Sequence, residues 1–161
     1  MKFTKSLIKG KLIKRYKRFF ADVKINNQIV TAHCPNTGSM MGLLKEGNEV
    51  FLLKNDNPKR KLKYGLEIIK ANNNLVGVNT HMANKIVSHG LVNNLIKELN
   101  YNDTIKSEVF FNKETRFDFL VEKKKQKCIE EVKNVTLSRN KKIFEFPDAI
   151  TLRKSKNLLN L

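Results

Sequence analysis

Two short segments in the second half of the chain carry residue types that could hold a metal ion against a phosphate. Asp118 lies within residues 116–121, and Glu131 and Lys133 lie within residues 129–133. Side chains alternate between the two faces of a strand, so Glu131 and Lys133 share one face while Val132 points into the core. If the two segments pair as strands, two carboxylates and one ammonium converge on one patch. An exposed, purely polar sheet face is the alternative interpretation.

The chemistry that such a patch supports is metal-dependent hydrolysis of a phosphodiester. Carboxylate oxygens are the ligands that Mg²⁺ prefers, and the ion keeps several waters for the reaction. A neighbouring lysine could orient the attacking water or stabilise negative charge on the scissile phosphate. Glu108, on an earlier apolar segment, could add a third carboxylate, although a single strand glutamate is often simply exposed.

The charge balance of the chain points to a polyanionic partner. The 161 residues include 32 lysines and arginines against 15 aspartates and glutamates, which leaves a net charge of +17 and a pI near 10. Basic side chains that neutralise phosphates release condensed counterions and so gain affinity for nucleic acid. Lysine outnumbers arginine by 26 to 6, so part of the excess could be compositional. Nucleic acid is therefore the favoured partner, and a merely solvated basic surface is the alternative.

The cysteines and the apolar segments indicate where the protein works. Cys34 and Cys128 are the only cysteines, and no Cys-x-x-Cys or Cys/His ligand spacing accompanies them. A zinc site is therefore not expected, and both thiols are expected to stay reduced. No apolar run approaches the length of a membrane span, and the basic N-terminus lacks a signal-peptide core. We expect a cytoplasmic protein with no membrane partner.

The first half of the chain has the pattern of a small β-barrel. Short alternating segments separated by turn residues predict strands at 19–25, 28–33, 49–53, 62–70 and 75–79. The first of these places Phe19 on the core-facing side together with Ala21 and Val23. About five short strands in eighty residues favour an OB-fold.

From residue 80 the apolar period becomes helical. Thr80 can cap a helix, and Gly90 is expected to break the helical segment into two. Three strands are then predicted at 105–111, 116–121 and 128–135, followed by a final amphipathic helix over 148–160. The chain is thus expected to be an α+β protein with a nucleic-acid-binding barrel over 1–80 and a second domain over 81–161.

Two basic segments of the predicted barrel are candidates for contacts with a nucleic-acid backbone. Residues 14–20 interleave basic and aromatic side chains, as strands that contact phosphates and stack bases do. Residues 57–61 form a basic turn between two strands. The candidate nucleic-acid-binding residues are Arg15, Lys17, Arg18, Lys59, Arg60 and Lys61. A core strand with a solvated basic face and a solvated turn are the alternatives.

Several longer segments together resemble one known family. The chain is similar over essentially its whole length to the sugar fermentation stimulation protein family, SfsA. The most specific segments are His33-Cys34-Pro35-Asn36-Thr37-Gly38-Ser39-Met40 and Phe146-Pro147-Asp148-Ala149. Further matches are found at 12–19, 77–80, 106–109, 116–119 and 131–137.

The resemblance implies an N-terminal OB-like barrel followed by a nuclease domain of the PD-(D/E)xK type. It also implies DNA binding, with DNA favoured over RNA, and metal-dependent nuclease activity with Mg²⁺ or Mn²⁺. Carried over by position, Asp118, Glu131 and Lys133 become the catalytic residues. Asp118, Glu131 and Glu108 become the metal ligands.

Two departures from the family pattern bear on these roles. Glu130 shares a face with Cys128 and Val132, where the family usually places an aliphatic residue. A buried carboxylate is costly unless it is paired, exposed or protonated, and this one could compete with Glu131 for the metal. Family members also continue beyond the point where this chain stops, so the nuclease-like domain is expected to be truncated and to lack a last strand. Reduced stability, a homodimer formed through the uncovered sheet edge, and loss of activity are the expected consequences.

Three functions remain open from the sequence. The first is a metal-dependent nuclease that binds nucleic acid. The second is a non-catalytic DNA-binding or regulatory protein linked to sugar metabolism, in which the acidic patch is vestigial. The third is an interaction module whose charge is mostly compositional.

Overall fold

The computed structural model describes residues 1–99, 103–113, 115–124, 126–140 and 143–145. These residues fall into two compact units. One is built on Lys2–Thr80 together with the segment that follows Asn134, and the other on Met1 and His81–Lys133. In the part of the chain that the structure describes, no helix is long and apolar enough to cross a membrane.

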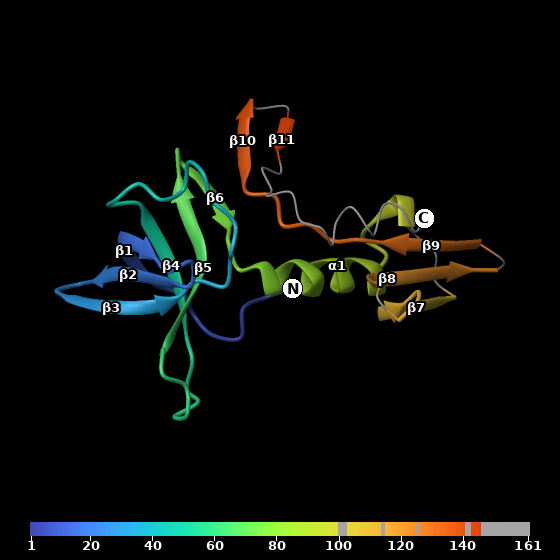
Figure 1. Ribbon diagram of the computed structural model, residues 1–161, viewed down its shortest axis with the longest axis horizontal. Coiled ribbons are helices and arrows are strands. Elements are labelled where there is room, and N and C mark those ends of the chain that lie inside the picture. The colour runs from blue at the N-terminus through green and yellow to red at the C-terminus, as the bar shows by residue number, and fades with distance from the viewer. Residues whose placement is uncertain (100–102, 114, 125, 141–142, 146–161) are drawn as a thin grey trace. The chain divides into compact units, whose positions relative to one another are not determined.

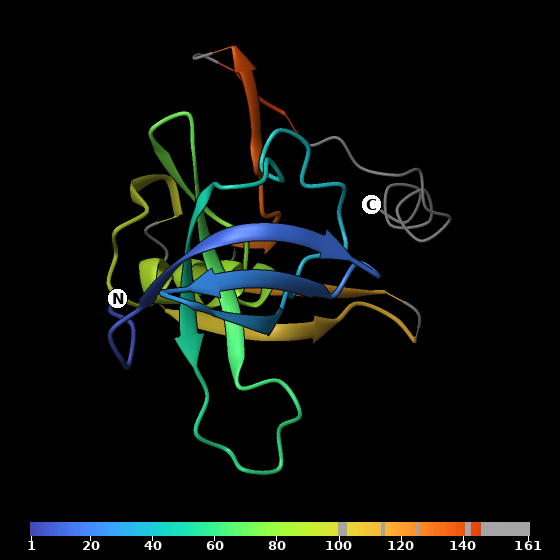
Figure 2. The same ribbon diagram turned by 90° about the vertical axis from the view of Figure 1, so that its left-hand side faces the viewer.

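The first unit is a β-barrel, as the alternating pattern predicts. Its sheet has the order β3-β2-β1-β4-β5-β6, and a parallel pairing of β3 with β5 joins the sheet back on itself (Figures 1 and 2). The strands are β1 (Ile8–Tyr16), β2 (Phe20–Ile25), β3 (Gln28–His33), β4 (Glu49–Lys54), β5 (Tyr64–Ala71) and β6 (Asn74–Gly77). The interior is filled by Leu12, Val23, Val50, Leu52, Leu66 and Ile69, all almost fully buried. Burial of these side chains is the main contribution to the stability of the barrel.

Two positions of the barrel show how closely its strands pack. At Gly10 a Cβ atom would lie 2.4 Å from Cγ1 of Val23 and 2.9 Å from the Lys24 carbonyl oxygen. Only glycine therefore fits where β1 meets β2. Phe19 was predicted to face the core, but it lies in the turn between β1 and β2 and its side chain is 44% exposed. The strand begins one residue later than the sequence pattern indicates, and the first core-facing side chain is Ala21.

The second unit places a helix against a three-stranded sheet. Helix α1 (Thr80–Val92) and the short 3-10 helix η1 (Lys97–Leu99) precede an antiparallel sheet of order β7-β8-β9. These strands are β7 (Thr104–Phe110), β8 (Arg116–Lys123) and β9 (Gln126–Glu130). Leu91 of α1 and Phe119 and Val121 of β8 form a small core, which the partly buried Val87 extends.

The prediction of a helix break at Gly90 is wrong. Helix α1 continues through this residue to Val92, and Gly90 is buried. A Cβ atom there would lie 3.2 Å from two carbon atoms of the Ile96 side chain. The glycine therefore serves close packing of the following segment on the helix, and it does not end the helix.

The segment after β9 differs from the prediction. Strand β9 ends at Glu130, whereas the sequence predicted a strand over 128–135. A short hairpin follows, formed by β10 (Leu137–Asn140) and β11 (Ile143–Glu145), and it belongs to the barrel unit. Arg139 donates through Nε to both carboxylate oxygens of Glu145, at 3.1 and 2.8 Å. The helix predicted over 148–160 lies outside the described residues.

Candidate functional site

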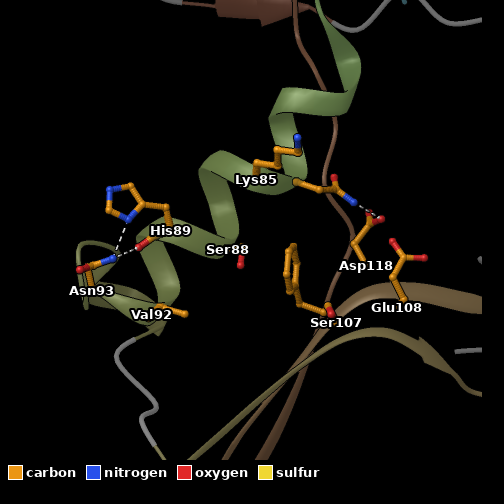
Figure 3. Close-up of a pocket in the computed structure, with 10 residues that line it drawn as sticks. Lys85, Ser88, His89, Val92, Asn93, Ser107, Glu108 and Asp118 are labelled. Atoms are coloured by element: carbon orange, nitrogen blue, oxygen red, sulfur yellow. Dashed lines mark hydrogen bonds between the residues drawn. The ribbon is translucent and has the colours of Figure 1, made fainter. Parts of the chain in front are cut away.

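Asp118 of β8 is held by two hydrogen bonds from opposite directions. The side-chain amide of Asn84, on α1, donates to Oδ1 at 2.8 Å (Figure 3). The backbone N–H of Val132, just beyond β9, donates to Oδ2 at 2.7 Å. Both donors are uncharged, and within the described residues no cation pairs with this half-buried carboxylate. A carboxylate has about four lone-pair positions, so acceptor capacity remains on both oxygens.

Glu131 and Lys133 lie beyond the last ladder pair of β8 and β9, which joins Phe119 to Glu130. The early end of β9 leaves the Val132 N–H free of the ladder, and it donates to Asp118 instead. Val132 packs against the small core, while Glu131 and Lys133 form an ion pair with each other and are about 40% exposed. The alternation predicted for these three residues is thus present, although the strand itself has ended.

Glu108 lies on β7 next to Asp118. The pairs Ser107–Phe119 and Val109–Phe117 flank this level of the sheet, and Figure 3 shows the Glu108 carboxylate beside that of Asp118. Its backbone has a φ of +56°, which is uncommon for a residue other than glycine. One carboxylate oxygen accepts from Nη1 of Arg116 at 2.8 Å. Glu108 is therefore near the candidate site but is engaged by an arginine.

The three candidate carboxylates are of a chemical type that binds divalent metals, but in the structure they do not converge on one point. Asp118, Glu131 and Glu108 offer the hard oxygen donors that Mg²⁺, Mn²⁺ and Ca²⁺ take. Among the described residues, no group of three or more His, Cys, Asp or Glu side chains is arranged to hold a metal ion. Glu131 forms an ion pair with Lys133, and Glu108 forms one with Arg116. Exposed ion pairs of this kind contribute only about 0–1 kcal/mol each, so turning either carboxylate toward an ion costs little.

The carboxylate of Glu130 has a partner. The Cys128 thiol, two residues earlier on β9, donates to Oε1 of Glu130 at 2.9 Å. This hydrogen bond raises the pKa of Cys128, and burial and the negative charge of Glu130 act in the same direction. Glu130 is thus paired in the half-buried position where the sequence analysis expected a conflict.

The six basic residues predicted to bind nucleic acid have different environments. The Arg15 guanidinium donates to the backbone carbonyls of Arg18 and Asn36, at 2.9 and 2.7 Å, and so braces the loop that follows β3. In the same loop Asn36 is buried and its Oδ1 accepts from the Gly38 N–H. The other five are exposed and make no ion pair within the described residues: Lys17 and Arg18 in the β1–β2 turn, and Lys59, Arg60 and Lys61 between β4 and β5.

Comparison with known families identifies both halves of the chain. Residues 13–78 match the family model described as the SfsA N-terminal OB domain, and residues 81–161 match the sugar fermentation stimulation protein RE domain. The chain belongs to the sugar fermentation stimulation protein family. The predicted α+β class with an N-terminal OB barrel is thereby confirmed.

Relatives and a solved structure agree with this assignment. A sugar fermentation stimulation protein homolog of Pelagibacter ubique is 74% identical over the whole chain, which spans 69% of that relative's length. A homolog of Alteromonas mediterranea is 50% identical, and the chain spans 71% of it. The structure of Pyrococcus furiosus SfsA in complex with Ca²⁺ matches the whole chain and 68% of its own length, with a TM-score of 0.83 and 22% identity. At that identity the likeness shows the shared fold.

The sequence analysis missed the contribution of α1 to this site. Asn84, Lys85, Ser88 and Val92 recur at helical spacing and line a pocket beside Asp118. The sequence prediction of this helix used only the period of its apolar residues and its candidate cap and break, Thr80 and Gly90. A helical projection would have shown the polar stripe, but it could not have shown that Asn84 reaches Asp118, because that contact depends on how α1 packs against β8.

The Cys128–Glu130 pair predicts a change in thiol reactivity on substitution. In Glu130→Gln the carboxylate that raises the pKa of Cys128 is gone, so the thiolate fraction at a given pH is larger. Alkylation of Cys128 by iodoacetamide should then be faster near pH 8, and its pH–rate profile should move to lower pH. Peptide mass spectrometry measures the rate at each cysteine, and the fully buried Cys34 is the internal control. Identical profiles in the two proteins would contradict the pairing.

Proposed function

We propose that this protein binds nucleic acid, DNA in preference to RNA, and hydrolyses phosphodiester bonds with the help of Mg²⁺ or Mn²⁺. The observation that carries the proposal is the Asp118 carboxylate, fixed at both oxygens by uncharged donors and not neutralised by a cation in the described part of the chain. A carboxylate held in this way keeps its direction, as a metal ligand requires.

The residues around Asp118 supply the remaining roles. Asp118, Glu131 and Glu108 would hold the ion, and the Val132 carbonyl is a further candidate ligand. A divalent ion bound there would polarise a phosphoryl oxygen and lower the pKa of a bound water. Lys133 places an ammonium next to Glu131, where it can stabilise charge on the scissile phosphate or orient the water.

The barrel over residues 1–80 is proposed as the main nucleic-acid-binding unit. OB barrels bind nucleic acids through their loops and one sheet face. The exposed residues Lys17, Arg18, Lys59, Arg60 and Lys61 make no ion pair within the described residues, so contacts with phosphates would not have to displace an internal partner. Arg15 remains a candidate of this set, although Nε and Nη2 of its guanidinium already donate to two backbone carbonyls.

A second candidate function is supported by a specific observation. Glu131 and Glu108 each pair with a basic side chain, and the described residues contain no assembled group of three metal-ligating side chains. This arrangement favours a DNA-binding protein without catalytic activity. The names of the relatives refer to stimulation of sugar fermentation, and a regulatory role in sugar metabolism is the corresponding biological proposal.

Cleavage assays separate the two candidates. Purified protein is incubated with single-stranded DNA, duplex DNA and RNA, in Mg²⁺, Mn²⁺ or EDTA. Asp118→Asn and Lys133→Ala should each lower metal-dependent cleavage by about 10²–10³-fold, because they remove groups that act on the reacting phosphate. Lys127→Ala is the matched control, since Lys127 also pairs with a strand glutamate, Glu122, away from Asp118.

Two results of this assay would contradict the hydrolytic function, and they differ from each other. Cleavage that persists in the Asp118 and Lys133 variants would show that a contaminant is responsible. Tight binding to DNA with no metal-dependent cleavage by the wild-type protein would favour the non-catalytic candidate.

If the basic loops of the barrel bind phosphates, the affinity of the protein for DNA should depend on salt concentration. The logarithm of the binding constant for duplex DNA should fall with the logarithm of salt concentration by about 0.9 for each phosphate contacted. Replacing Lys59, Arg60 and Lys61 together by glutamine should make this slope shallower by about 0.9 for each phosphate contact that is lost. Lys24→Gln, at an exposed position on β2, is the single-charge control. Fluorescence anisotropy measures the affinities, and a wild-type affinity that does not change with salt would exclude binding through phosphates.

A further inference from the structure

A pocket of about 480 Å³ opens between α1 and the strands β7 and β8 (Figure 3). On the helix side it is lined by Lys85, Ser88 and Val92, and on the strand side by Ser107, Glu108 and Asp118. The volume lies within the range of pockets that bind small molecules. It also lies directly beside the carboxylate on which the proposed function depends.

The two ends of the pocket differ in chemistry. Lys85, next to Asn84, lies at the end where Asn84 contacts Asp118, so this end carries charges of both signs. Val92, seven residues further along α1, lies about 10 Å away at a rise of 1.5 Å per residue, and its side chain is 65% exposed. His89 and Asn93 line the pocket near Val92, and Asn93 donates to the His89 carbonyl oxygen. An elongated ligand with one anionic end and one apolar face fits this arrangement.

The donors at the charged end are available to a ligand. Within the described residues Lys85 makes no ion pair, and the hydroxyl of Ser88 has no hydrogen-bond partner there. Figure 3 shows Ser88 on the helix side of the pocket and Asp118 on the strand side. An ammonium and a hydroxyl one helical turn apart are suitable donors for one phosphate group.

The size of the pocket favours an unpaired nucleotide over a base-paired duplex. A base-paired duplex is much too wide to enter a space of about 480 Å³, whereas one nucleotide with its phosphate can. The apolar surface of Val92 can pack against a base of any identity, because every base has an apolar face.

We propose that this pocket binds one unpaired nucleotide of a single-stranded or frayed nucleic acid, with its phosphate at Lys85 and Ser88 and its base against Val92. The inference rests on the proposed function, because it places a phosphodiester next to Asp118. It also narrows that function, since the preferred substrate is then a single strand or an unpaired end. Binding to the pocket does not require hydrolysis and can be measured separately.

The test uses the full chain in EDTA, with thymidine 5′-monophosphate, thymidine and ribose 5-phosphate as probes. Two-dimensional NMR titration gives each dissociation constant. The monophosphate should bind most tightly of the three. Lys85→Ala should weaken the monophosphate and ribose 5-phosphate about tenfold, because a charge-assisted hydrogen bond is lost. Val92→Glu should weaken the monophosphate and thymidine by a similar factor and leave ribose 5-phosphate unchanged.

Matched controls come from the same unit. Ile86→Glu introduces the same charge at an exposed position of α1 that does not line the pocket, and Lys97→Ala removes an exposed lysine of η1. Neither should change the dissociation constants. Equal losses in Ile86→Glu and Val92→Glu would overturn the proposal.

Two further results would also overturn it. Ribose 5-phosphate that binds as tightly as the monophosphate, with no effect of Val92→Glu, would assign the pocket to sugar phosphates. Absence of monophosphate binding, combined with metal-dependent cleavage of single strands that Val92→Glu leaves unchanged, would refute the nucleotide site and leave the proposed function standing. Monophosphate binding with the predicted losses and no cleavage would support the nucleotide site and refute the hydrolytic function.

Discussion

The hydrogen bonds that hold Asp118 are the interaction on which the candidate site depends. Three separate parts of the second unit meet at this carboxylate: α1 through Asn84, β8 through Asp118 itself, and the segment after β9 through the Val132 N–H. Because β9 stops at Glu130, the next residues are free to bring Glu131 and Lys133 past the end of the ladder. The helix, the sheet and the segment that carries Glu131 and Lys133 are therefore joined at the Asp118 carboxylate.

The ion pairs around Asp118 give the site two possible arrangements. In the structure Glu131 is bound by Lys133 and Glu108 by Arg116, so neighbouring charges are balanced without an ion. Such exposed pairs are weak, and a divalent ion could compete with both basic side chains for the carboxylates. Under the proposed function, Glu108 and Glu131 would exchange these basic partners for the ion, and in the non-catalytic candidate they would keep them.

The sequence predicted the barrel and the alternation around Val132 well, because both follow from local periodicity. It failed where packing between distant segments decides. Gly90 was predicted to break the helix, yet it lies in the last turn of α1, where the Ile96 side chain packs closely against it. The pattern around Arg15 could not show that Nε and Nη2 of its guanidinium donate to the backbone carbonyls of Arg18 and Asn36. The helical period places Asn84 on a polar stripe, but its contact with Asp118 could not be predicted because it depends on the packing of α1 against β8.

Direct measurement of metal binding tests the central claim that Asp118, oriented by Asn84, is the core of a metal site. Calorimetric titration of Mn²⁺ into the full chain should show one site in the wild-type protein. Asp118→Asn should abolish it, and Asn84→Leu should weaken it about 10–100-fold, as loss of a ligand-orienting hydrogen bond does in other metal sites. Mn²⁺ affinities that are the same in all three proteins would contradict the account.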